Sequence, residues 1–505
     1  MILYCSGHAY HYELENLCRV FCPAARVAVR RREDCKPPAK ITRQVAQVGF
    51  VVFSRMEATA CGWRVEVLLV RGTARFRLHR FVEEQTQTEL AFAQLLYCLL
   101  LRALRAKAPP WGLLTGVRPS KLMRRLQREE GEQTALRRFR DVLWVSAEKT
   151  ELARCVAAAE APVLALTAPQ SFSLYTSIPF CPSRCSYCSF VSHTVDRASA
   201  QKLISPYLDC LCAELEATAA ITARLGLRLE SVYVGGGTPA VLEAEQLARL
   251  CGTVNRLFGQ CAEFTVEAGR PDVITKEKLL ALRESGVNRV SVNPQSLRDD
   301  VLRRAGRLHT AAQCVESYML ARATGFEGVN MDLIAGLPGD DPAGFAATLR
   351  EILALRPENI TMHTLAIKRA ADLRAQAAQT GHRYTERMLA LAAQMLPAAG
   401  YAPYYMYRQS RSLGNLENIG WSLPDKLCRY NIDMMEESHT VLGCGAGAVT
   451  KLKAPHSDLL ERVFCFKYPY EYLSRFQEVL ARKARIEHFY SRNTMIQGVE
   501  NGGNP

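Results

Sequence analysis

The chain has 505 residues, of which 48% are hydrophobic and 23% are charged, and its formal net charge is +14. This composition is typical of a soluble globular protein of roughly two to four domains. There is no run of about 20 uncharged apolar residues, and the first residues lack the basic-then-apolar layout of a signal peptide. We therefore expect no membrane span and a cytoplasmic location.

The cysteines and the positive charge limit the function classes. Eighteen cysteines are too few for a secreted disulfide scaffold of this length, so we expect most of them to be small buried hydrophobic residues. Cys18 and Cys22 form a CxxxC pair, for which core positions are favoured over a second metal site. No nucleic-acid-binding motif accompanies the positive charge. An anionic substrate and a diffuse surface charge both remain open.

The beginning of the chain predicts an α+β domain over residues 1–110 and a basic helical connector over residues 111–165. A helix rich in Leu and Ala is expected over residues 89–107, ending at Pro109-Pro110. Alternating or β-branched segments predict a small antiparallel sheet. Its strands are expected at residues 26–32, 45–53, 63–70 and 74–81.

Residues 166–370 repeat one unit, in which a short apolar strand is followed by an amphipathic helix. Six such strands with crossover helices predict a parallel sheet with right-handed connections. An eightfold barrel takes about 250 residues, so we expect an incomplete (β/α)6 barrel of the TIM type, open on one side. The expected strands are 172–178, 231–234, 263–267, 289–292, 328–334 and 359–364. The expected helices are 201–225, 243–258, 276–285, 311–324 and 343–355.

The remaining residues, 371–505, predict a C-terminal α/β extension of the barrel. Its expected elements are a helix over 385–396, an aromatic strand over 401–408, a Gly-rich run over 442–449 and helices around 470–483.

Three cysteines, Cys181, Cys185 and Cys188, follow the first barrel strand at CxxxCxxC spacing. Iron–sulfur clusters normally take four cysteines, and no fourth follows nearby, so one iron of a [4Fe–4S] cluster is left for another ligand. In this spacing the usual ligand is S-adenosylmethionine (SAM), which the reduced cluster converts to a radical. Zinc is the alternative, but structural zinc needs two ligand pairs and no partner pair fits convincingly.

Polar residues and glycines lie at the ends of successive predicted strands, where barrel enzymes carry their catalytic groups. Gly235–Pro239 follows the second strand, and we expect its backbone N–H groups to hold the carboxylate or amino end of SAM. The other positions, strand by strand, are Glu267, then Gln295 with Arg307, then Asp332, and then Ala366 before Lys368 and Arg369.

With these residues in place, the chain resembles the radical SAM family of oxygen-independent coproporphyrinogen III oxidases (dehydrogenases), and most of all its HemZ-type branch. The resemblance runs from about residue 111 to about residue 451. It implies a radical SAM partial barrel with a HemN-like C-terminal domain. The segments that carry it are 114–121, Tyr175 with the cysteine loop, 235–239, 265–272, 306–310, 330–339, 404–408, 414–418 and 442–451.

The resemblance implies an oxidative decarboxylation in haem biosynthesis. A SAM-derived radical removes hydrogen from the β-carbon of a propionate, and loss of CO₂ and one electron leaves a vinyl group. Two propionates react, which converts coproporphyrinogen III to protoporphyrinogen IX. The family uses a second SAM, and a reductant such as flavodoxin or ferredoxin is implied. Lys368, Arg369 and Arg408 suit the carboxylates of this anionic tetrapyrrole.

The resemblance also assigns residues by position. Cys181, Cys185 and Cys188 would bind the cluster. Tyr175, which is also the candidate catalytic residue, would bind the first SAM together with Gly236 and Glu267. The residues implied for the second SAM are Tyr187, Gly237, Thr238, Gln295, Arg307, Asp332 and Ala366.

The chain departs from the family at three positions. Ser177 and Phe190 stand where the coproporphyrinogen dehydrogenase has a histidine and a further cysteine. Tyr430 stands where the related haem chaperones have the histidine of an HNxxYW motif. The absent histidine argues against a haem chaperone but does not exclude haem binding elsewhere. A haem-trafficking protein and another radical SAM reaction on a tetrapyrrole are the alternatives, and the N-terminal domain has no assigned role.

Overall fold

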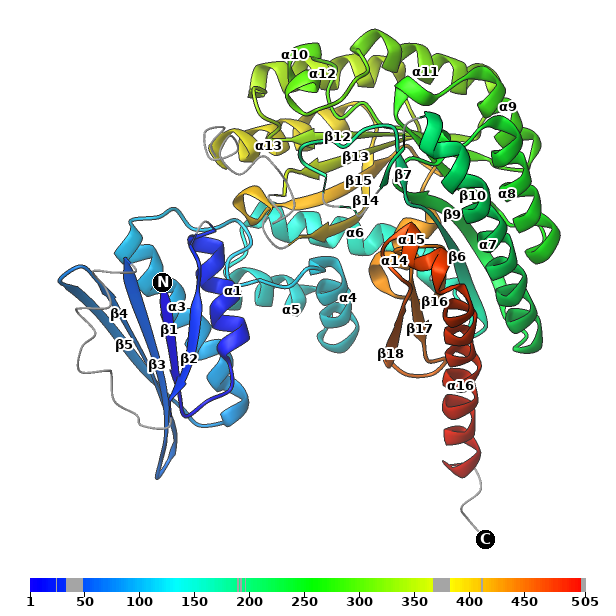
Figure 1. The fold of residues 1–505 in the computed structure, drawn as a ribbon. Coiled ribbons are helices and arrows are strands. Elements are labelled where there is room, and N and C mark those ends of the chain that lie inside the picture. Colours follow the sequence, from blue (N-terminus) through cyan, green and yellow to red (C-terminus); the bar gives the residue numbers. More distant parts are fainter. Residues whose placement is uncertain are drawn as a thin grey trace. The chain divides into compact units, whose positions relative to one another are not determined.

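The computed structural model describes residues 1–23, 25–32, 49–188, 190, 193–195, 197–366, 382–409 and 412–500 (Figure 1). The chain forms two compact units. The first comprises Met1–Arg154 with Gly414–Leu416, and the second comprises Cys155–Leu413 with Glu417–Pro505. The four-domain division expected from the sequence stays a prediction.

The first unit contains a mixed sheet covered on one face by two helices. The strand order is β2-β1-β3-β4-β5, and β1 runs parallel to both β2 and β3. The expected antiparallel pairing is confirmed for β3, β4 and β5 but was wrong for β2, because helix α1 returns the chain between β1 and β2 and so allows parallel pairing. The elements are β1 (Ile2–Ser6), α1 (His11–Phe21), β2 (Ala28–Arg32), β3 (Phe50–Thr59), β4 (Gly62–Arg71), β5 (Ala74–Val82) and α3 (Thr88–Leu104).

The core of this unit lies between the sheet and the two helices. Leu3 and Val52 from the strands pack in one buried cluster with Leu17 of α1 and Leu96 of α3. The range of the basic helical connector expected after α3 contains three α-helices. These are α4 (Pro119–Glu130), α5 (Glu132–Arg137) and α6 (Ala147–Ala165), the last of which leads into the second unit.

The second unit contains the predicted partial barrel. Six neighbouring parallel strands follow one another in chain order, and the helices between them form an outer layer (Figure 1). The strands are β6 (Ser171–Ile178), β9 (Arg228–Gly236), β10 (Glu263–Gly269), β11 (Arg289–Val292), β12 (Gly328–Ala335) and β13 (Asn359–Thr364). The helices are α7 (Arg197–Arg224), α8 (Ala244–Phe258), α9 (Lys276–Glu284), α10 (Asp299–Arg304), α11 (Ala311–Thr324) and α12 (Pro342–Leu355).

Side chains cap the N-termini of barrel helices and so fix where these helices begin. Thr310 and Gln313 form a reciprocal capping box at the start of α11, and the Asp341 carboxylate accepts from two backbone N–H groups of α12 at 2.9 Å. Such caps satisfy the first N–H groups of a helix, which have no partner within it. The loops that carry the site therefore start and end at defined positions.

The C-terminal segment extends the barrel sheet at both edges. Strand β15 pairs antiparallel with β13, and β16 pairs parallel with β6. Within the described residues the sheet has 11 strands. The added strands are β14 (Ala402–Arg408), β15 (Glu417–Ser422), β16 (Thr440–Cys444), β17 (Val449–Lys453) and β18 (Leu460–Phe464). The added helices are α13 (His382–Ala398), α14 (Arg429–Glu436), α15 (Pro469–Ser474) and α16 (Phe476–Glu500).

None of the helices in the described ranges is both long enough and apolar enough to cross a membrane.

Candidate active site

A cavity of about 380 Å³ runs along the inner face of the barrel sheet. It reaches from Arg289 and Asn359, the first residues of β11 and β13, to the loops that follow the strands. The structure brings every residue expected to bind the cluster or SAM into the wall of this one cavity. These residues are Tyr175, Cys181, Cys185, Tyr187, Cys188, Gly236, Gly237, Thr238, Glu267, Gln295, Arg307, Asp332 and Ala366.

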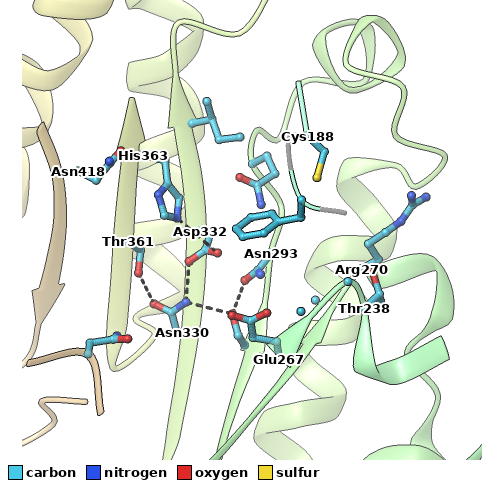
Figure 2. A pocket seen from close by; sticks show the side chains of 18 of the residues that line it. Cys188, Thr238, Glu267, Arg270, Asn293, Asn330, Asp332, Thr361, His363 and Asn418 are labelled. Carbon is cyan, nitrogen blue, oxygen red and sulfur yellow. Dashed lines mark hydrogen bonds and ion pairs between the residues drawn. The ribbon is translucent and has the colours of Figure 1, made fainter. Parts of the chain in front are cut away.

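The cysteine loop follows β6 and is tied to its surroundings by backbone hydrogen bonds. Cys181 ends the short strand β7 (Phe180–Cys181), which pairs with β8 (His193–Thr194). The Cys188 N–H donates to the Cys185 carbonyl at 3.1 Å, and the Ser186 N–H donates to the Ala305 carbonyl at 3.0 Å. These bonds hold the three thiols against the same cavity, where Figure 2 shows Cys188 above Thr238 and Arg270.

The donor set fits an iron–sulfur cluster better than a single metal ion. Three cysteine thiols lie in the wall of one cavity, and a cubane binds each of its cysteines at a separate iron. Burial raises the pKa of Cys188, and the charges of Cys185 and Cys181 raise it further. The Thr238 hydroxyl donates to the Cys181 sulfur at 3.5 Å. Bound iron would relieve the mutual repulsion of three thiolates.

The glycine motif after β9 packs directly against the cysteine loop. The Gly237 and Thr238 N–H groups donate to the carbonyls of Ile178 and Phe180, both at 2.7 Å. These two N–H groups are therefore used by the segment that leads to Cys181, and SAM binding at Gly235–Pro239 stays a prediction. A side chain at Gly237 would lie 2.4 Å from the Phe180 carbonyl oxygen and 2.9 Å from the Cys181 sulfur. The bare backbone of Gly237 is thus required by the close approach of the loop.

Two carboxylates in the cavity have pKa values shifted in opposite directions. Burial raises the pKa of Glu267 to about 7; the Asp332 charge adds to the rise, and the hydrogen bond from Tyr233, 2.6 Å long, opposes it. Burial alone would also raise the pKa of Asp332, but contacts with His363 and Asn330 hold that pKa below its ordinary value. Near neutral pH, Glu267 can therefore be protonated while Asp332 stays charged.

The Asp332 side chain belongs to a chain of polar contacts on the inner face of the sheet (Figure 2). The Asn330 amide donates to Asp332 at 2.8 Å and to the Ser291 hydroxyl at 3.0 Å. The Thr361 hydroxyl donates to the Asn330 oxygen at 2.9 Å. This network fixes the Asp332 carboxylate at the middle of the cavity wall.

Arg307, Tyr187 and Gln295 form the wall on the side of β11. The buried Arg307 guanidinium donates to the Tyr187 hydroxyl at 2.9 Å and to the Asn293 carbonyl at 2.6 Å. Gln295 has a left-handed backbone, with φ of 66°, and its buried Oε1 has no hydrogen-bond partner in the described part of the chain. A strained backbone that presents an unsatisfied acceptor is a common feature of ligand sites.

Tyr175, which was expected at the site, lines the cavity beside Tyr233, and both stack with Tyr430, which is not part of the wall; the sequence did not indicate Tyr233 or the stack. The rings of Tyr233 and Tyr430 lie 4.4 Å apart at 18°, and Tyr175 lies 6.4 Å from each of them. Tyr175 and Tyr233 come from adjacent strands, and Tyr430 comes from α14. Only the inward alternation of β6 and β9 could have indicated the first two, and nothing local indicates Tyr430.

Of the three basic residues expected to bind substrate carboxylates, the structure describes Arg408. Arg408 is only 3% exposed, lies opposite Glu417 in the β14–β15 pair and is not part of the cavity wall. Burial lowers its pKa to about 10. Lys368 and Arg369 lie outside the described residues. Phe190, by contrast, lines the cavity mouth and is 70% exposed.

A buried polar network supports the cysteine loop from behind. The Lys483 ammonium on α16 lies 2.8 Å from the Glu214 carboxylate on α7, which also accepts the Gly445 N–H at 2.8 Å. The Tyr207 hydroxyl donates to the Ser177 carbonyl at 2.8 Å and accepts the Ala446 N–H at 2.9 Å. These bonds hold the Gly-rich run after β16 against the end of β6, just before the cysteine loop.

A sequence model of the Radical SAM superfamily matches residues 175–352, the part of the chain that carries the cysteine loop and most of the barrel. The oxygen-independent coproporphyrinogen-III oxidase-like protein HemZ of Bacillus subtilis (strain 168) is 34% identical over 84% of this chain and 88% of its own length. The chain belongs to the radical SAM superfamily and, within it, to the HemZ-type branch of the coproporphyrinogen III oxidase family.

Two further comparisons place this radical SAM protein among its relatives. The haem chaperone HemW of Bacillus subtilis (strain 168) is 35% identical over 39% of this chain and 51% of its own length. The structure of coproporphyrinogen III oxidase (HemN) from Escherichia coli aligns with a TM-score of 0.50 at 23% identity, covering 64% of this chain and 72% of that one. The HemN similarity shows a shared fold. Membership in the superfamily implies a [4Fe–4S] cluster and SAM as cofactors.

Proposed function

We propose that this protein catalyses the radical SAM oxidative decarboxylation of coproporphyrinogen III propionates to vinyl groups, giving protoporphyrinogen IX. The observation that carries the proposal is the single cavity that contains the three cysteines, both carboxylates and the aromatic wall. A porphyrinogen presents apolar pyrrole faces and an anionic rim, and aromatic walls with a few polar groups suit such a ligand. The HemZ and HemN similarities support the same reaction class.

The chain's own residues would have distinct tasks in this reaction. Cys181, Cys185 and Cys188 would hold the cluster, leaving one iron for the first SAM. When bound, the cluster and SAM supply a radical that takes a hydrogen atom from the substrate. Tyr175 and Glu267 would orient the first SAM, and the tyrosine wall excludes water from the reacting carbon.

A second SAM is part of the proposal. Gln295, Arg307 and Asp332 lie on consecutive strands or loops of the same wall, away from the cysteine loop in sequence. Asp332 would remain charged and attract the amino or sulfonium group of SAM, while Arg307 would attract its carboxylate. An external reductant such as flavodoxin or ferredoxin would supply the electron, and we place the protein in the cytoplasm on its composition.

The test is a turnover assay on anaerobically reconstituted protein with dithionite, SAM and coproporphyrinogen III. The expected products are the monovinyl and divinyl compounds, each propionate losing CO₂ and two hydrogen atoms, with 5′-deoxyadenosine formed in step. Continued SAM cleavage without decarboxylation would reject the substrate while retaining the radical SAM chemistry. The Cys185→Ala protein is the negative control.

The second candidate is a haem-trafficking protein, because haem chaperones are among the relatives of the barrel. Tyr430, at the position of the chaperone histidine, is buried in the tyrosine stack, and its hydroxyl has no hydrogen-bond partner among the described residues. A stoichiometric haem complex that forms without any turnover of coproporphyrinogen III would favour this candidate. Its absorption spectrum would be compared with that of a Tyr430→Phe protein.

A further inference from the structure

Asn418 on β15 carries a hydrogen-bond donor that the protein itself does not use. The side chain is 1% exposed, yet its residue lines the cavity, and its Nδ2 has no partner within the described ranges. Its Oδ1 accepts the Thr364 N–H at 2.7 Å. This bond fixes the amide, because turning it over would place two donors against each other. The orientation of the Asn418 amide is therefore fixed, and the atom without a partner is the donor Nδ2.

His363 lies next to this donor. The β13–β15 pairing includes Met362 opposite Ile419, so the next residues along, His363 and Asn418, lie across from each other. The His363 side chain is 27% exposed and lines the same cavity. Its Nε2 lies 3.6 Å from the Asp332 carboxylate, and Figure 2 shows the ring between Asp332 and Asn418. The imidazole thus separates the Asn418 donor from the Asp332 charge.

A buried donor without a partner needs an acceptor from a ligand, since an unsatisfied N–H inside a protein is unfavourable. The ligands of the proposed reaction carry carboxylates as their strongest acceptors, four on the tetrapyrrole and one on SAM. An anion accepts from an amide N–H such as Asn418 Nδ2 more strongly than a neutral group does. The His363 ring also shields such an anion from Asp332.

We propose that Asn418 and His363 form a subsite for a ligand carboxylate, supplied by a tetrapyrrole propionate or by SAM. The proposal rests on the proposed function for the identity of its ligands. It adds a directional contact on the β13–β15 side of the cavity, where no residue was assigned. The subsite would position one carboxylate by hydrogen bonding instead of by an arginine.

The test is equilibrium binding to the full chain with its cluster reconstituted, under anaerobic conditions at a pH near 8. Coproporphyrin III is titrated by fluorescence quenching and SAM by calorimetry. Asn418→Asp keeps the acceptor for the Thr364 N–H but replaces the free donor with an anion. Replacing an attractive charge-assisted bond with repulsion is expected to weaken binding of the carboxylate ligand about 10- to 100-fold. Loss of coproporphyrin III affinity identifies a propionate, and loss of SAM affinity identifies SAM.

Two further variants complete the test. Asn493→Asp on α16 makes the same chemical change outside the cavity wall and is expected to bind both ligands as the wild type does. His363→Leu removes the ring without changing Asn418 and provides the comparison if Asn418→Asp does not fold. The proposal is overturned if both cavity variants bind both ligands within about twofold of the wild type. Wild-type protein that binds coproporphyrin III but does not decarboxylate coproporphyrinogen III would reject the proposed function alone.

Discussion

Removing the Lys483 ammonium should destabilise the protein strongly, although Lys483 lies far along the chain from the cysteine loop. Lys483 is 6% exposed and Glu214 is 1% exposed, and their charged atoms lie 2.8 Å apart. Lys483→Met would leave a buried carboxylate with hydrogen bonds from Gly445 and Tyr472 but without a counter-charge. Breaking one side of a buried ion pair costs about 3–5 kcal/mol. We expect the free energy of unfolding to fall by that amount in urea denaturation near neutral pH.

The same two helices provide a matched control. Arg224 on α7 pairs with Glu487 on α16 at 2.8 Å, but these side chains are 58% and 37% exposed. Arg224→Met should therefore change the unfolding free energy by about 1 kcal/mol or less. Lys483→Met combined with Glu214→Gln should recover part of the loss, since no unpaired charge stays buried. If Lys483→Met lowers the free energy of unfolding by less than about 1 kcal/mol, the argument that the buried Glu214 carboxylate needs the Lys483 charge is refuted.

Three other changes test the site. Cys185→Ala should abolish both the cluster, measured by iron content and visible absorption, and SAM cleavage; retained cleavage would contradict the ligand assignment. Gly237→Ala should lower cluster content, because the added methyl group would push away the Phe180 carbonyl and the Cys181 sulfur. The control is Gly252→Ala on α8, where a Cβ would have no atom within 4 Å of it. That variant should bind iron normally, and its free energy of unfolding should rise by about 0.5–1 kcal/mol. Glu267, whose pKa is raised to about 7 from 4.5, favours the folded state most below pH 4.5 and loses that contribution as the pH rises through 7. Without the cluster, the free energy of unfolding of the wild type should therefore fall by about 3 kcal/mol relative to that of Glu267→Gln as the pH rises through this range. A difference between the two proteins that does not change with pH would be inconsistent with a raised pKa.

The barrel could be predicted from the sequence because its strands are buried on both faces. β11 (Arg289–Val292) and β13 (Asn359–Thr364) were predicted with their observed bounds, since each is a short run with β-branched residues that begins at a polar residue. Strand β1 was missed because it starts at the second residue and has no turn signal before it. Its parallel pairing depends on α1, whose role as a crossover is not visible in any local pattern.

The candidate site could be predicted where it follows the strand order and not where it depends on the C-terminal segment. The residues from Tyr175 to Ala366 lie on barrel strands or on the loops after them, so topology alone gathers them at one wall. Asn418 lines the cavity from β15, and Tyr430 stacks on the cavity residue Tyr233 from α14, both after the barrel is complete in sequence. The use of the Gly237 and Thr238 N–H groups by the cysteine loop also depends on a contact between strands that spacing does not reveal.

The pairing of β16 with β6 sets an order for assembly of the protein during synthesis. Strand β6, which leads into the cysteine loop, has β9 on one side and β16 on the other, and β16 ends at Cys444. The Glu214–Lys483 pair that secures this junction is completed only by α16. A nascent chain that has emerged only as far as β13 therefore has its three cysteines but an open strand edge beside them. Cluster insertion into a stable site would thus follow release of nearly the whole chain from the ribosome.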